Sequence, residues 1–139
     1  MKFKKALEQT YNNFKRAIPI LFGVLILISI VTISIPGEYY KKIFSGNLFF
    51  DSIIGTAIGS IAAGNPITSY VIGGELLAEG VSLVAVTAFI LSWVTVGMVQ
   101  LPAEILMLGK RFAITRNILA FISAIIISIL TVLTLRIFS

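Results

Sequence analysis

The sequence predicts an all-α integral membrane protein with three full transmembrane helices, a broken re-entrant helical hairpin and an N-terminal amphipathic helix. Of its 139 residues, 58% are hydrophobic and 12% are charged, whereas soluble domains carry about 25% charged residues. The apolar residues form long runs, and the basic residues gather in short clusters beside them, which is typical of membrane helices. One apolar run is interrupted by Gly64-Asn65-Pro66.

Composition also excludes several classes of function. Cysteine and histidine are both absent, so disulfides, thiolate or imidazole metal sites and Cys or His catalysis are ruled out. We therefore expect no cofactor, no metal site and no enzyme activity, because no histidine or Lys–Ser pair activates the abundant hydroxyls. The net charge of +5 arises from clusters at the ends of apolar runs, which indicates membrane orientation and no nucleic-acid partner.

Residues 1–16 place Phe3, Leu7, Tyr11 and Phe14 at helical spacing among lysines and asparagines. This pattern predicts a short amphipathic helix at the membrane surface. A polar leader before the first span fits the same residues equally well.

The first transmembrane helix is predicted over 17–35. Pro19 falls in its first turn, where a missing N–H does no harm, and Pro36-Gly37 ends it. The run is too long for a signal peptide and no cleavage site follows it, so we interpret it as a retained span.

The stretch 48–78 is the most informative. Asp51 is the predicted N-cap of a helix of about 12 residues, or roughly 18 Å. Gly64-Asn65-Pro66 then supplies a favoured C′ residue, N-cap and first helical residue, so a second short helix follows. Neither helix covers the ~30 Å hydrocarbon core, which favours a re-entrant hairpin with its tip at mid-membrane. If the first helix begins at Leu48, it nearly crosses, and the break is a turn near the far face.

A third membrane helix is predicted over 81–109, with a kink at Pro102 because proline removes one helix hydrogen bond. A last span is predicted over 117–136. Orientation follows from eight Lys and Arg residues that would share the cytoplasmic side, against three outside. The eight are 2, 4, 5, 15, 16, 110, 111 and 116, and the three are 41, 42 and 136. We therefore predict a multi-pass protein of the inner or plasma membrane, with its N-terminus in the cytoplasm and its C-terminus outside.

The break at 64–66 is the first candidate site. Irregular backbone in lipid must be buried in protein or line a watery cavity, and three spans are too few to enclose it, so we expect a homodimer. The N-terminus of the second helix favours an anion. The predicted substrate-binding residues are Asn65, Pro66, Thr68 and Ser69. A kink that only permits close packing is the alternative.

Small residues around Gly55 and Gly59 predict a helix-packing face, either against the other arm of the hairpin or across a dimer. Glu75 is the candidate for coupling or gating, because a carboxylate within a membrane segment is costly unless it faces protein or water. For Glu104 a plain interfacial ion pair with Lys110-Arg111 is expected.

Further along, Ser92, Thr95 and Gln100 are candidates to line a polar path. They serve equally well as hydrogen-bonding groups between helices. Trp93 is interpreted as a packing residue.

Three segments together resemble the family of predicted permeases that includes the YraQ and organoarsenical (ArsP-type) permeases. They are Gly59-Ser-Ile-Ala-Ala-Gly-Asn-Pro-Ile-Thr68, Gly80-Val-Ser-Leu-Val-Ala-Val-Thr-Ala-Phe89 and Gln100-Leu-Pro-Ala-Glu104. The resemblance covers about residues 55–120, and the chain looks like a half-size, single-unit member. It implies a permease whose pathway is built by two copies, with Asn65, Pro66, Thr68 and Ser69 in the substrate region. Arsenical-type members carry cysteines near the first break and this chain has none, which argues against a thiophilic substrate.

We therefore expect a homodimeric permease among membrane lipids that moves a small, preferably anionic solute by alternating access. The alternative is a non-transporting scaffold subunit of a larger membrane complex. Charge bias favours a parallel dimer, whereas analogy with inverted repeats favours an antiparallel one.

Overall fold

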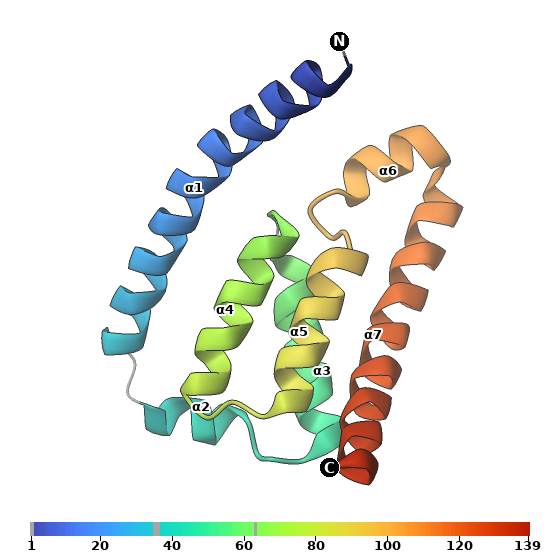
Figure 1. Cartoon of the computed structure of the whole chain (residues 1–139). Coiled ribbons are helices and arrows are strands. Elements are labelled where there is room, and N and C mark those ends of the chain that lie inside the picture. The colour runs from blue at the N-terminus through green and yellow to red at the C-terminus, as the bar shows by residue number, and fades with distance from the viewer. Residues whose placement is uncertain (1, 35–36, 63) are drawn as a thin grey trace. The chain divides into compact units, whose positions relative to one another are not determined.

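The computed structural model describes residues 2–34, 37–62 and 64–139 (Figure 1). These residues form α-helices and no strand, which confirms the predicted all-α class. The helices are α1 (Lys2–Ser34), α2 (Gly37–Ile43), α3 (Leu48–Ile61), α4 (Pro66–Ala78), α5 (Leu83–Thr95), α6 (Leu101–Leu108) and α7 (Lys110–Phe138). The chain divides into two units, Met1–Ile35 and Pro36–Ser139.

The first unit is a single helix. α1 runs without interruption for 33 residues, or about 50 Å, and Pro19 lies inside it. The predicted separate helices over 1–16 and 17–35 are therefore wrong in this respect. Lys15 and Arg16 are good helix formers and carry the first helix directly into the apolar run. The predicted stop at Pro36 lies outside the described residues.

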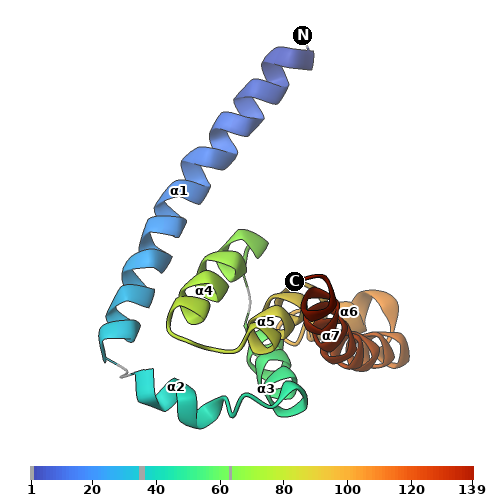
Figure 2. The same ribbon diagram turned by 60° about the horizontal axis from the view of Figure 1, so that its bottom comes forward.

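In the second unit α5 is the central helix. It contacts α3, α4 and α7, and the two views in Figures 1 and 2 place it among them. Its buried side chains point in several directions around the helix, as expected for an element covered on more than one side. They are Val84, Ala85, Val86, Ala88, Phe89 and Ser92.

α3 and α5 approach each other at backbone distance. A Cβ added at Gly55 would overlap the carbonyl oxygen of Ala85, and one added at Gly59 would overlap Ser92 Oγ and the carbonyl oxygen of Phe89. The small face of α3 is thus a packing face. Its partner is α5, and neither the other hairpin arm nor a second copy is needed to explain it.

The second unit has small and polar groups inside and large apolar groups outside. Ser52, Thr56 and Ser60 are buried on α3, and each hydroxyl donates to a carbonyl oxygen of its own helix at 2.7–2.8 Å. On the outside, Leu106 is 87% exposed and Phe112 is 57% exposed. This arrangement is the reverse of a soluble domain, in which polar residues cover an apolar core.

One helix in the described part of the chain is long and apolar enough to cross a membrane, namely α7 with 29 residues. α3 and α5 are apolar but shorter, at 14 and 13 residues. Within the described residues, the structure therefore shows helices without strands and one candidate span.

The predicted kinked helix over 81–109 is wrong, because the chain leaves the helical path between α5 and α6. Val96 adopts an extended conformation (φ −97°, ψ 112°), and the Gly97 N–H donates to Asn117 Oδ1 at 2.8 Å. Pro102 does not kink a long helix but lies in the first turn of α6, where no N–H is required. At the other end of α6, Gly109 has φ +89°, a conformation that favours glycine.

The start of α3 also differs from the prediction. Asn47 is the N-cap, with Oδ1 accepting from the Phe49 N–H at 3.0 Å, so the helix begins at Leu48. Asp51 is fully buried and accepts from the Ser45 and Gly46 N–H groups at 3.0 and 3.2 Å and from Ser82 Oγ at 2.6 Å. Asp51 therefore joins the start of α3 to the residue before α5.

Candidate functional site

The first half of the site is the break between α3 and α4. α3 ends at Ile61 and α4 begins at Pro66. Asn65 caps α4: its Oδ1 accepts from the Ile67 N–H at 3.0 Å, and its carbonyl oxygen accepts from the Thr68 N–H at 2.9 Å. Pro66 has no N–H to offer. The positive end of the α4 dipole remains at the break, but these first-turn donors are occupied by the chain itself.

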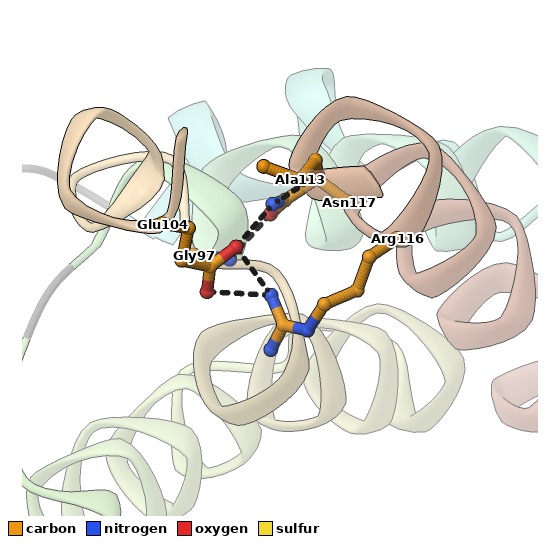
Figure 3. A network of polar contacts seen from close by, with 5 residues as sticks. All are labelled: Gly97, Glu104, Ala113, Arg116 and Asn117. Carbon is orange, nitrogen blue, oxygen red and sulfur yellow. Dashed lines mark hydrogen bonds and ion pairs between the residues drawn. The ribbon is translucent and has the colours of Figure 1, made fainter. Parts of the chain in front are cut away.

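The second half is the break between α5 and α6, held by a polar network that joins it to α6 and α7 (Figure 3). Asn117 accepts from the Gly97 N–H and donates through Nδ2 to Glu104 Oε2 and to the Ala113 carbonyl oxygen, both at 3.0 Å. The amide thereby satisfies a backbone donor that the helix break has released. It also connects the break to α6.

The two breaks meet around one cavity of about 200 Å³. Trp93, in the last turns of α5, spans the distance between them, with Nε1 donating to the Gly64 carbonyl oxygen at 3.4 Å. The residues that line the cavity are Ala62, Gly64, Pro66, Trp93, Val94, Val96, Gly97, Val99, Gln100 and Arg116.

Arg116 contributes the positive charge at this cavity. Its Nη1 donates to both carboxylate oxygens of Glu104, at 2.7 and 2.9 Å, and the Arg116 and Glu104 side chains are 40% and 16% exposed. The predicted pairing of Glu104 with Lys110-Arg111 is therefore wrong. Residues 110–116, which lie between the predicted helices over 81–109 and 117–136, form the first turns of α7 and carry Arg116 to the break.

Of the four predicted substrate-binding residues, Pro66 lines the cavity. Asn65 acts as the cap of α4. Ser69 is fully buried, and its hydroxyl donates to the Pro66 carbonyl oxygen at 2.6 Å. Thr68 is 8% exposed and, like Ser69, is not among the lining residues.

Of the three residues predicted to line a polar path, one lines the cavity and two do not. Gln100 lines the cavity. Ser92 is fully buried at the contact of α5 with Gly59, and Thr95 is exposed with its hydroxyl bonded to the Leu91 carbonyl oxygen at 2.7 Å. Glu75 is exposed on α4, nine residues after Pro66 and thus about 13 Å further along the helix.

Sequence reasoning missed Arg116, Trp93 and the Glu104–Asn117 pairing. Arg116 and Asn117 stand at the edge of the last apolar run, and a basic residue there was interpreted only as an orientation signal. An amide directly beside it at the start of a long apolar helix was the available sign of a buried polar contact.

The cavity combines a guanidinium, an amide, an indole and irregular backbone, which suits the binding of a small polar solute. It holds no Ser, Thr or Lys among its described lining residues to act as a nucleophile. No protein-family model, curated protein or solved structure matches the chain.

Proposed function

We propose that this chain is the subunit of a multi-pass membrane permease, and that a small polar solute passes through the cavity between the two helix breaks. The observation that carries the proposal is the meeting of two interrupted helices at one polar cavity. Non-helical backbone within a membrane protein is tolerated where it is buried in protein or lines water. Interrupted helices that face a common cavity are the usual construction of a transporter's binding site.

The apolar exterior and the length of α7 support placement in a membrane. From Asn117 to Phe138, α7 rises about 32 Å, close to the ~30 Å hydrocarbon core. Because Asn117 bonds Gly97, the cavity would lie near the Lys110 end of this span. The positive-inside rule assigns that end to the cytoplasm. This favours a hairpin that nearly crosses over one whose tip stops at mid-membrane.

A homodimer is part of the proposal. One chain supplies few helices to enclose the cavity between the two breaks. A second copy would complete the enclosure, as the resemblance to half-size permeases implies. Glu75 remains the candidate for coupling or gating, acting from α4 outside the cavity.

Solute entry into proteoliposomes tests the proposal. Vesicles with the purified protein are mixed with a panel of small polar solutes, and swelling is followed by light scattering. We expect uptake of at least one solute above that of empty vesicles. Gly97→Leu, which fills the cavity, should abolish it, while Gly74→Leu, at a position with nothing within 4 Å of an added Cβ, should preserve it.

Equal uptake by Gly97→Leu and Gly74→Leu vesicles would exclude the cavity as the path. If no solute enters at all while the protein assembles normally, the scaffold function is favoured.

A further inference from the structure

We propose that Arg116 recognises an oxyanion in this cavity, and that Glu104 is an internal counterion that competes with it. The inference rests on the proposed function and specifies its substrate class. A guanidinium has five N–H donors in a fixed plane, and the pairing with Glu104 uses one nitrogen, Nη1. Nε and Nη2 make no hydrogen bond to any residue that the structure describes.

The surroundings favour an oxyanion over a neutral solute. Arg116 is the one basic side chain among the described lining residues, and its planar donors match the oxygens of a carboxylate, sulfate or phosphate group. The positive dipole end of α4 at Pro66 adds to the same field. Because the first N–H groups of α4 are bonded to Asn65, direct hydrogen bonds to the anion must come from elsewhere, and Arg116 supplies them.

The size of the cavity limits the ligand. Its volume is about 200 Å³, whereas sites for drug-sized ligands begin near about 300 Å³. Gln100 adds an amide that can donate to the oxyanion, and the Trp93 indole lines the same cavity. A small oxyanion fits this combination.

Glu104 sets the strength of the site. Its carboxylate receives hydrogen bonds from Arg116 and Asn117 and neutralises the charge that would attract a ligand. An entering anion therefore meets a second negative charge a few ångströms away. Replacement by glutamine removes that charge while an amide oxygen still accepts from Asn117 or Arg116, so the site should strengthen without losing its frame.

Trp93 gives a direct readout, because it is the chain's one tryptophan and lines the cavity. Protein purified in a phospholipid-free detergent is titrated with sulfate or acetate at constant ionic strength set by chloride, and indole fluorescence is recorded. We expect a saturable change that becomes at least about tenfold weaker in Arg116→Gln, as the loss of a charge-assisted hydrogen bond implies. Glu104→Gln should bind more tightly than wild type.

Arg111→Gln is the matched control, since it removes an exposed cation five residues earlier on α7 that does not line the cavity. Its titration should equal that of wild type. A parallel titration with phosphatidylglycerol in mixed micelles distinguishes the source of the oxyanion. A response to free sulfate or acetate assigns a soluble solute, and a response to the lipid alone assigns its headgroup phosphate. In both cases loss in Arg116→Gln supports the inference.

A fluorescence response that is unchanged by Arg116→Gln, or the absence of any response in folded protein, overturns the inference. The proposed function is tested separately by the uptake experiment. If the inference is overturned but Gly97→Leu still blocks solute uptake, the cavity is a path for a neutral solute, and only the oxyanion assignment is wrong.

Discussion

Asp51 shows how a single buried charge can organise the second unit. Its carboxylate is fully buried and accepts three hydrogen bonds, from two backbone N–H groups and the Ser82 hydroxyl. Ser82 precedes α5 and makes no capping bond with its side chain. The Ser82 hydroxyl donates to Asp51 instead of capping α5. This hydrogen bond joins the start of α5 to the start of α3.

We expect Asp51→Ala to destabilise the protein, because it removes the fully buried carboxylate that accepts from the Ser45 and Gly46 N–H groups and from the Ser82 hydroxyl. A buried hydrogen bond to a charged group contributes about 1.5–3 kcal/mol, and the two backbone donors contribute less because Ser45 and Gly46 are exposed. Asp51→Asn keeps one acceptor oxygen and should be less damaging. Thermal unfolding in detergent, followed by circular dichroism, measures the difference, with Glu75→Ala as a control at an exposed carboxylate. Equal unfolding temperatures for Asp51→Ala and the control would contradict this role.

At the residue scale, the sequence predicted what depends on neighbours along the chain. Asn65 and Pro66 begin α4 because capping chemistry is local. Asp51 was misplaced because Asn47, four residues earlier, satisfies the same capping rule. The partner of Glu104 was predicted wrongly because Arg116 lies 12 residues away from it, and no local pattern specifies such a pair.

At the scale of the element, the two helix breaks are stabilised in different ways. The break before α4 was predicted, because the local sequence Gly64-Asn65-Pro66 specifies it. The break between α5 and α6 lies in an apolar stretch that resembles a continuous helix. It is stabilised by Asn117 on α7, a tertiary contact that a helix-by-helix interpretation does not contain.

Asn117→Ala should therefore loosen the second break selectively. The Gly97 N–H loses its acceptor and Glu104 loses one donor, which predicts faster hydrogen exchange over 96–100 and in α6. Asn65→Ala is the matched change at the other break and should instead affect the start of α4, at a cost of about 1 kcal/mol. Unchanged exchange at Gly97 in Asn117→Ala would show that the break holds without the amide.

The contact between α3 and α5 depends on glycine. Gly59→Ala forces a Cβ onto the carbonyl of Phe89 and the hydroxyl of Ser92, so the helices must separate, at a cost of about 1–3 kcal/mol. Gly74→Ala meets nothing within 4 Å and should be neutral or stabilising, because alanine favours helix. Unfolding temperatures of the two variants test this. If the Gly59→Ala and Gly74→Ala proteins are equally stable, α3 and α5 can separate at little cost, and the prediction is wrong.

For the whole molecule, composition determined the helical class and the apolar exterior. Element lengths were harder to predict, because the runs that suggested continuous spans contain breaks or extend through predicted boundaries. α1 passes through the expected junction at 16–17, and α5 and α6 divide the expected third span. A hydropathy pattern reveals neither a helix that continues past an apolar run nor a break within one. The break between α5 and α6 depends on a hydrogen-bond partner on another helix.

The most direct test of the permease proposal is the accessibility of single cysteines, introduced into a chain that has none. Gln100→Cys lies in the cavity, Ser45→Cys precedes α3 at the opposite end of the second unit, and Ser128→Cys is a fully buried control on α7. Each is treated with a membrane-impermeant maleimide in intact cells and in opened membranes. We predict that Ser45→Cys reacts in intact cells, that Gln100→Cys reacts only after opening, and that Ser128→Cys stays unlabelled. A Gln100 cysteine that stays unreactive in opened membranes, like the Ser128 control, would show a dry break and contradict the account.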